Sequence, residues 1–163
     1  MSPLHSVHVA TVYGTVAKSL IWKLKLAGAQ SAARIMARHM AGLISSLPGE
    51  AIIVPVPTAA GRVRQRGYDQ AKLLARELSG QTRLPYRNCL ARSGQTHQHG
   101  LPRRERLTQL ETAFHASKAS AIRKARVILV DDVVMTGATL EAVAKVLWAA
   151  GAAQIDAIVF AQS

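Results

Sequence analysis

The chain has 163 residues, 49% of them hydrophobic, which is enough for one domain with a sizeable core and excludes a disordered chain. The formal net charge is +12, and the single cysteine, Cys89, excludes an internal disulfide and a cysteine-based zinc ribbon within these residues. Residues 1–10 lack the pattern of a signal peptide, and no apolar run reaches the length of a membrane span. We therefore expect a cytoplasmic protein.

The positive charge is concentrated in one part of the chain. Residues 62–106 contain eleven basic and three acidic residues, a net charge of +8. Such a field attracts polyanions, so nucleic acid, polyphosphate and phosphorylated metabolites are candidate ligands. Because the basic residues coincide with glycine-containing segments and not with one helix face, we favour anion binding over solubility alone.

Residues 12–47 contain two helical patterns. The apolar residues of the first recur at the period of an α-helix and are Tyr13, Val16, Ala17, Leu20, Ile21 and Leu24. A second helix is predicted from about Ser31 to Leu47, before Pro48 and Gly49. Trp22 lies off the first apolar stripe. We expect it to pack against the second helix, with stacking on a base as the alternative.

Strand and helix patterns alternate in the rest of the chain. Residues 51–54 predict a buried strand that ends at Pro55 and Pro57, which cannot donate to a sheet. The other expected elements are a helix over 67–78, short strands over 84–87 and 113–115, and a polar loop over 91–109 with one helical turn near 103–107. Residues 127–130, 137–150 and 155–161 form a β-α-β unit. This order predicts an α/β fold with a parallel sheet flanked by helices.

Residues 127–140 carry the clearest chemical pattern. Asp131 and Asp132 follow an apolar run, and a turn into a helix follows with Thr136, Gly137, Ala138 and Thr139. The backbone N–H groups of such a turn, with the helix dipole, favour an anion of phosphate size. Adjacent carboxylates accept hydrogen bonds from a vicinal diol, and a nearby Mg²⁺ reduces their repulsion. The segment predicts a site for a ribose 5-phosphate. A capping or Arg-paired acidic loop is the alternative.

The same segment resembles the motif that binds 5-phosphoribosyl 1-pyrophosphate (PRPP) in type I phosphoribosyltransferases. The resemblance implies that Asp131 and Asp132 hold the ribose 2- and 3-hydroxyls, that residues 136–139 hold the 5-phosphate, and that Mg²⁺ is carried by PRPP without other protein ligands. It also implies a single domain over 1–163, with a small helical hood over 12–47 and a core over 50–163. Met135 stands where some members carry an acidic general base, so a hypoxanthine-guanine type of acceptor is not expected.

Further motifs resemble the competence protein ComF family (ComFC/GntX-like). They are Val54-Pro55-Val56-Pro57, Arg66-Gly67-Tyr68-Asp69-Gln70, and Gln98-His99-Gly100-Leu101 followed by Arg103, Arg106 and Ala113-Phe114. The resemblance runs from about residue 12 to the C-terminus. Gln109 and Thr112 replace a usual Asn and Gly, and longer members begin with a zinc ribbon, which we expect this chain to lack.

The basic segments supply candidates for binding pyrophosphate. The candidate pyrophosphate loop consists of Pro57, Thr58, Ala59, Ala60, Gly61 and Arg62. Arg66 is assigned to catalysis together with Asp131 and Asp132, because a guanidinium can neutralise a leaving pyrophosphate. A mobile loop that contains Gln98, His99, Arg103 and Arg106 is expected to close over the site and exclude water.

The resemblance implies a pentosyltransferase that moves the phosphoribosyl group of PRPP to an unidentified acceptor and is associated with competence and DNA uptake. A non-enzymatic module that senses a nucleotide or binds single-stranded DNA or a partner in natural transformation is the alternative. Transfer to ammonia is a weaker third reading. Expected partners are PRPP or a nucleotide, with single-stranded DNA, DNA-uptake proteins and a second copy of the chain as further candidates.

Overall fold

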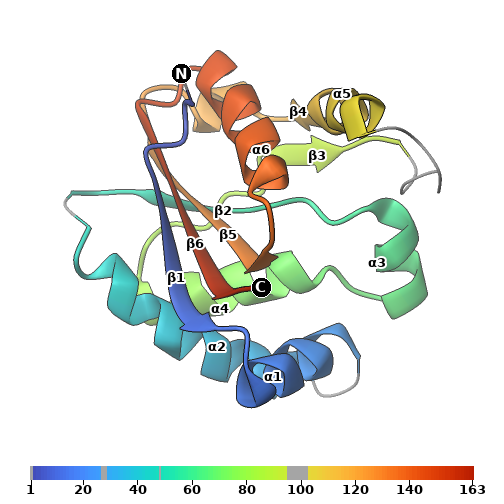
Figure 1. Cartoon of the computed structure of the whole chain (residues 1–163). Helices are drawn as coiled ribbons and strands as arrows, with labels where there is room; N and C mark the ends of the chain where they lie inside the picture. The colour runs from blue at the N-terminus through green and yellow to red at the C-terminus, as the bar shows by residue number, and fades with distance from the viewer. Residues whose placement is uncertain (1, 27–28, 48, 95–102) are drawn as a thin grey trace.

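A four-stranded parallel sheet forms the centre of the protein in the computed structural model, which describes residues 2–26, 29–47, 49–94 and 103–163 (Figure 1). The strand order is β1 (Ser6–Val12), β6 (Gln154–Gln162), β5 (Arg126–Val134) and β2 (Ile52–Pro55). Each neighbouring pair is parallel. The predicted α/β fold with a parallel sheet is therefore confirmed.

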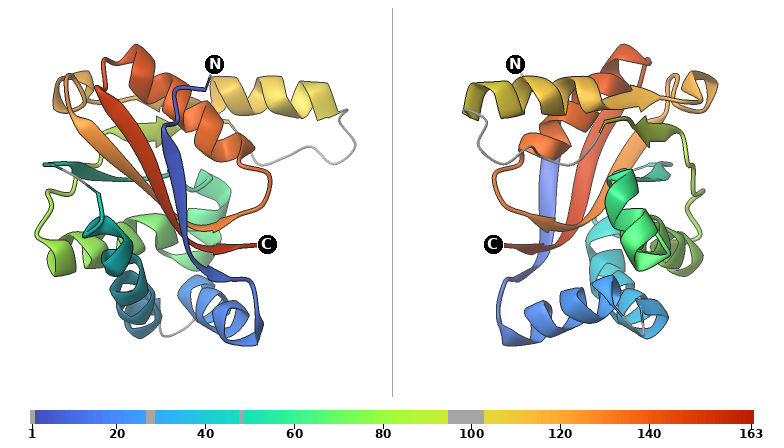
Figure 2. Two further views of the ribbon diagram at one scale, coloured as in Figure 1. Left: turned by 60° about the vertical axis from the view of Figure 1, so that its left-hand side comes forward. Right: turned by 90° about the vertical axis from the view of Figure 1, so that its right-hand side faces the viewer.

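Helices cover both faces of this sheet (Figure 2). On one face lie α2 (Ala29–Ile44) and α4 (Gln70–Thr82), with α1 (Thr15–Lys25) beside α2. On the other face lies α6 (Ala138–Ala149), next to α5 (Arg103–Ala113) and a small antiparallel sheet of β3 (Leu90–Arg92) and β4 (Phe114–Ala116). The remaining elements are α3 (Ala60–Arg66) and a 3₁₀ turn, Ala119–Ala121. This layering places the carboxyl ends of β5 and β6 toward α1.

The alternation of side chains along β5 divides the core into two clusters. Ile128 and Val130 pack in the cluster with α2 and α4, whereas Val127 and Leu129 pack in the cluster with α6. All four are at most 1% exposed. A strand buried on both faces needs a continuous apolar run, which is why residues 127–130 could be recognised from the sequence.

The structure corrects several predicted elements. The strand β1 and the strand β3 were not predicted. The end of the expected polar loop over 91–109 belongs to α5, which is longer than the single helical turn predicted near 103–107. The predicted strand over 84–87 is reduced to a single bridge between Tyr86 and Ile53. Trp22, which was expected to pack against the second helix, is 66% exposed. None of the helices in the described ranges is long and apolar enough to cross a membrane.

A buried ion pair joins three strands at the amino-terminal end of the sheet. Asp156 of β6 is 0% exposed, and its carboxylate lies 2.9 Å from the guanidinium of Arg126 in β5. Ser6 of β1 and Gln154 also donate hydrogen bonds to Asp156. Burial by itself raises the pKa of Asp156, but the hydrogen bonds from Ser6 and Arg126 and the charge of Arg126 lower it below its ordinary value.

Candidate functional site

The central strand β5 continues past the end of its neighbour β2. Pairing between the two strands ends at Pro55 and Val130, after which Val56 donates one more hydrogen bond to the Val130 carbonyl, 2.9 Å away. Asp131 and Asp132 follow immediately and lie inside β5, not in a loop after it as the sequence suggested. Because Pro57 cannot donate to a sheet, the chain turns away and leaves this edge of β5 open.

The two carboxylates differ in their surroundings. Asp132 is 6% exposed, and its Oδ2 lies 3.0 Å from the ammonium nitrogen of Lys25 in α1. Oδ1 of Asp131 accepts a hydrogen bond of 2.9 Å from the backbone N–H of Asp132. The charge of Asp131 also acts on Arg92 of β3, on the side of the sheet covered by α6. Lys25 of α1 and Arg92 of β3 therefore both interact electrostatically with the pair.

Asp131 is held in an unfavourable electrostatic position. Burial is the main reason that its pKa is well above its ordinary value, and the neighbouring charge of Asp132 raises the pKa further. Lys25 acts in the opposite direction and does not remove the effect. Hydroxyl donors or a cation at this point would stabilise the ionised pair. This arrangement is suited to a ligand with a diol or with bound Mg²⁺.

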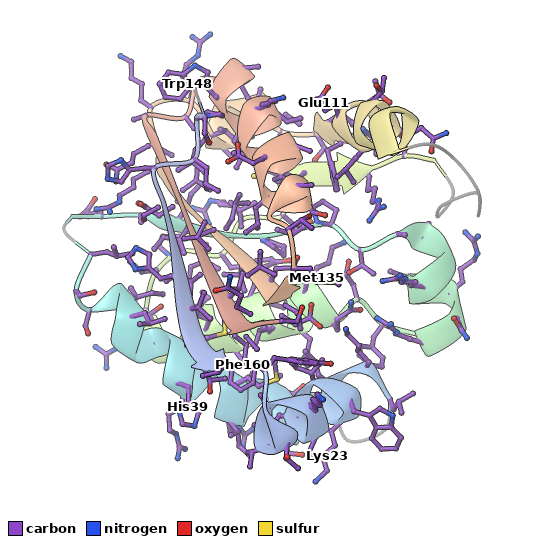
Figure 3. All side chains as sticks on the ribbon, in the orientation of Figure 1. Lys23, His39, Glu111, Met135, Trp148 and Phe160 are labelled. Atoms are coloured by element: carbon purple, nitrogen blue, oxygen red, sulfur yellow. The ribbon has the colours of Figure 1, made fainter. Side chains whose placement is uncertain are left out.

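The turn after β5 leads directly into α6. Gly137 has a φ of 78°, the left-handed region, and precedes the first residue of the helix. The Thr136 hydroxyl accepts a long hydrogen bond of 3.4 Å from the backbone N–H of Ala138, whereas the N-cap residue Gly137 has no side chain to cap the helix. Met135 is 74% exposed and lies at the end of β5, between α6 and α1 (Figure 3). The first turn of α6 therefore begins six residues after Asp132.

The backbone at Gly137 provides a direct test of this turn. A Cβ at Gly137 would meet no atom within 4 Å, so Gly137→Ala should cost only the conformational energy of a left-handed residue, about 1–2 kcal/mol. Gly80→Ala in α4 is the matched control, because Gly80 has equal space but no positive φ, and the change should stabilise by about 0.5–1 kcal/mol. Urea unfolding measures both. Equal effects of the two changes would contradict a strained turn.

Residues 66–70 connect four elements around the site. Gly67, with a φ of 82°, ends α3 and allows the chain to reverse. Asp69 caps α4 by accepting hydrogen bonds from the N–H groups of Ala71 and Lys72, and the same oxygen accepts one of 3.0 Å from the Thr58 hydroxyl. The Arg-Gly-Tyr-Asp-Gln motif therefore fixes the segment after β2 as well as the start of α4.

Tyr68 attaches the end of α1 to this segment. Its hydroxyl lies 2.8 Å from the carbonyl oxygen of Leu26 and within hydrogen-bonding distance of that of Leu24, so it can donate to either. Burial raises the pKa of Tyr68, and the charge of Arg66 partly opposes this. Since the last carbonyl groups of a helix lack partners within it, Tyr68 supplies a cap for α1.

Tyr68→Phe should release this cap. We expect a loss of about 1 kcal/mol, the usual contribution of one hydrogen bond, and faster hydrogen exchange confined to the last turn of α1. Tyr13→Phe is the control, because it keeps the exposed ring over which Lys18 lies. Exchange spread evenly over the whole protein would show that Tyr68 does not act on α1 specifically.

A pocket of about 470 Å³ lies between α1 and α3. Its lining residues are Trp22, Lys25, Leu26, Gln65 and Arg66. Since Lys25 also pairs with Asp132, the pocket begins next to the two carboxylates. The sequence did not indicate Lys25 or Gln65, because their role depends on the packing of α1 against a distant segment.

The remaining predicted site residues are placed as follows. Pro57 and Ala59 are buried after β2, but the expected pyrophosphate loop is shorter than predicted, because Ala60, Gly61 and Arg62 begin α3. Gln98 and His99 lie outside the described residues. Arg103 and Arg106 belong to α5 and not to a loop. Thr139 lies in the first turn of α6.

The sheet, the open end of β5 and the turn into α6 define a member of a known family: the chain belongs to the phosphoribosyl transferase domain family, whose sequence model matches residues 27–163. Among curated proteins it is similar to competence protein F of Haemophilus influenzae, with 39% identity over 107 residues, 64% of this chain and 47% of that protein. It is also similar to competence protein ComFC of Bacillus subtilis, with 33% identity over 102 residues, 63% of this chain and 40% of that protein. These relatives confirm the resemblance to the ComF family, and the chain spans less than half of their length.

Solved structures support the same fold. Glutamine PRPP amidotransferase from B. subtilis, complexed with ADP and GMP, aligns with a TM-score of 0.52 at 19% identity, covering 78% of this chain and 26% of that one. An allosteric regulatory enzyme of purine biosynthesis aligns with a TM-score of 0.51 at 20% identity, covering 78% and 25%. At these identities the likeness concerns the fold alone.

Proposed function

We propose that this protein binds PRPP together with Mg²⁺ and transfers the phosphoribosyl group to a nucleophilic acceptor. The observation that carries the proposal is the position of Asp131 and Asp132 at the open end of β5, one short turn before Gly137 and the start of α6. In this proposal the carboxylates accept hydrogen bonds from the ribose 2- and 3-hydroxyls. The 5-phosphate lies against the N–H groups of residues 137–139 and the Thr136 hydroxyl.

The carboxylates also fit a magnesium ion carried by the substrate. Mg²⁺ prefers oxygen ligands and usually keeps several waters and substrate phosphates in its shell. Among the residues described, no group of three or more His, Cys, Asp or Glu side chains is gathered to form a protein cage. When bound, Mg²⁺ supplies positive charge that offsets the charge of the pyrophosphate.

In the proposed reaction the bond between ribose C1 and the pyrophosphate oxygen breaks, and its electron pair leaves with pyrophosphate. A lone pair of the acceptor forms the new bond to C1. Arg62 of α3 is the proposed donor to the leaving group, where developing negative charge is stabilised by charged hydrogen bonds. Met135 cannot accept a proton, so the acceptor either reacts as an anion or loses its proton to another group or to the leaving pyrophosphate.

Isothermal titration with PRPP and Mg²⁺ tests the donor site. We expect binding to the wild-type protein and none to the Asp131→Ala/Asp132→Ala variant. Glu50→Gln/Glu111→Gln is the matched control, since it removes two exposed carboxylates outside the site and should leave binding unchanged. Absence of binding to the wild type, or equal binding to the Asp131→Ala/Asp132→Ala variant, would refute the proposal.

A second candidate function is binding of single-stranded DNA, favoured by the exposed positions of Arg62 and Arg64 on α3 and of Arg76 on α4. The competence proteins to which the chain is similar point in the same direction. Binding through these side chains should weaken steeply with salt and persist in the Asp131→Ala/Asp132→Ala variant. A lack of affinity for oligo(dT) even at low salt would exclude direct contact.

A further inference from the structure

Trp22 is the unusual member of the pocket between α1 and α3. A tryptophan of a small domain is normally largely buried, yet 66% of Trp22 is exposed. It shares the pocket with Leu26, which is 47% exposed. An exposed indole beside an aliphatic side chain provides a flat apolar surface, on which a planar ring can stack.

The charged side chains that line the pocket are all positive. Lys25 and Arg66 are cations, Gln65 is neutral, and none of the five lining residues is acidic. The Nη1 atom of Arg66 is buried and has no hydrogen-bond partner among the described residues. Arg66 as a whole is half-buried and lines the pocket, so its guanidinium can bind a carboxylate or phosphate there, which would offset the cost of the unpaired nitrogen.

The pocket also adjoins the proposed reaction centre. Lys25 reaches from the pocket to Oδ2 of Asp132, 3.0 Å away. Met135, the exposed residue after β5, offers neither a charge nor a base with which to recognise a purine.

We infer that this pocket binds the acceptor, and that the acceptor is a small molecule with a planar ring and an anionic group, either a carboxylate or a phosphate. The ring stacks on Trp22, and the anion binds Arg66 with Lys25 beside it. That the bound molecule is the acceptor of the reaction rests on the proposed function. The recognition of a planar anion rests on the pocket alone.

Titration followed by NMR tests the inference in the full chain, because the indole N–H signals of Trp22 and Trp148 report on two distant places. Figure 3 shows Trp148 on α6, at the opposite end of the molecule from Lys23 on α1. The probes are benzoate and phenyl phosphate, with benzamide as the neutral match and cyclohexanecarboxylate as the non-planar match. We expect one or both anionic rings to shift Trp22 and not Trp148, and to bind about 10- to 150-fold more tightly than benzamide, the range expected for a hydrogen bond to a charged group.

Variants separate stacking from charge. Trp22→Ala should weaken binding of the anionic ring about 5- to 100-fold, whereas Trp148→Ala should not change it. Arg66→Gln should abolish the preference over benzamide, and Arg64→Gln, an exposed arginine on the same helix, should preserve it. Binding is followed by the backbone amide of Leu26 where Trp22 is absent.

Three outcomes would overturn the inference. The first is equal affinity for benzoate, phenyl phosphate and benzamide. The second is an affinity for cyclohexanecarboxylate equal to that for benzoate. The third is a shift of the Trp22 signal by oligo(dT) with no shift by the anionic rings. PRPP is titrated calorimetrically in parallel. Loss of PRPP binding with intact ring binding counts against the donor site, and intact PRPP binding without ring binding counts against this pocket.

Discussion

Asp131→Asn should weaken the binding of PRPP about 10- to 150-fold and, in the absence of ligand, should make the protein more stable at neutral pH. The first effect follows because an amide cannot form the charged hydrogen bonds that a carboxylate forms with hydroxyls. The second follows because the half-buried Asp131 loses solvation and lies beside the charge of Asp132, and both effects raise its pKa well above the ordinary value. Asparagine keeps the shape, and its oxygen can still accept from the N–H of Asp132.

The dependence of the free energy of unfolding on pH follows from the raised pKa of Asp131. Since the pKa of Asp131 is higher in the folded than in the unfolded protein, the folded state binds more protons between the two values, and stability falls as pH rises through that interval. The asparagine variant lacks this fall. The difference in free energy of unfolding between variant and wild type should therefore be near zero below about pH 4 and grow as pH rises.

Urea unfolding from pH 4 to pH 8, with and without PRPP and Mg²⁺, measures both effects. Saturating ligand should reverse the order of stability, because it stabilises the wild type and binds the variant poorly. Glu111→Gln is the control, since Glu111 is an exposed carboxylate paired with Lys145. A variant that is less stable than the wild type at pH 7 without ligand would contradict an electrostatic conflict at Asp131.

Arg126→Met should destabilise the protein by about 3–5 kcal/mol without acting directly on the ligand site, because it leaves a buried carboxylate unpaired. Asp156 is 0% exposed, and Arg126 provides two of its hydrogen bonds, at 3.0 and 2.9 Å. The pair lies at the amino-terminal end of the sheet, whereas Asp131 and Asp132 lie toward the carboxyl end of β5. A loss of this size is a large part of the stability of a small domain.

A double variant distinguishes the lost partner from lost packing. Arg126→Met/Asp156→Leu replaces both charges by apolar groups and should recover most of the loss, since buried ion pairs are often replaceable as a pair. Lys145→Met, which breaks the exposed pair with Glu111, should change stability little. Equal destabilisation by the single and double variants would show that packing and not charge is responsible.

The ion pair of Arg126 and Asp156 also predicts that the stability of the protein decreases in acid. The pKa of Asp156 is lower in the folded than in the unfolded protein, so its contribution to stability is present above the unfolded value of about 3.9 and is lost as pH falls through the folded value. Arg126→Met should reduce this acid sensitivity. Unfolding midpoints between pH 2 and pH 5 measure the effect.

Where local sequence carried the physical signal, the prediction from sequence was correct. The β-α-β unit of β5, α6 and β6 was predicted because a strand buried on both faces requires a continuous apolar run and an amphipathic helix requires the 3.6-residue period. Asp131, Asp132 and the turn at Gly137 were recognised because they follow one another in the chain. Their proposed roles follow from the resemblance and await the tests above.

Where interacting residues are distant in sequence, only the tertiary structure showed which residues are in contact. The strand β1 pairs with β6 near the other end of the chain, so no local pattern revealed it. The segment of α5, Arg103–Ala113, is strongly polar and lacks an apolar stripe, and its helix lies beside α6. The contact of Lys25 with Asp132 and the exposure of Trp22 both depend on where Tyr68 holds α1. The sequence therefore determined the unit of β5, α6 and β6 and the residue pattern of the proposed donor site, whereas the pocket beside it exists only because packing brings α1 next to α3.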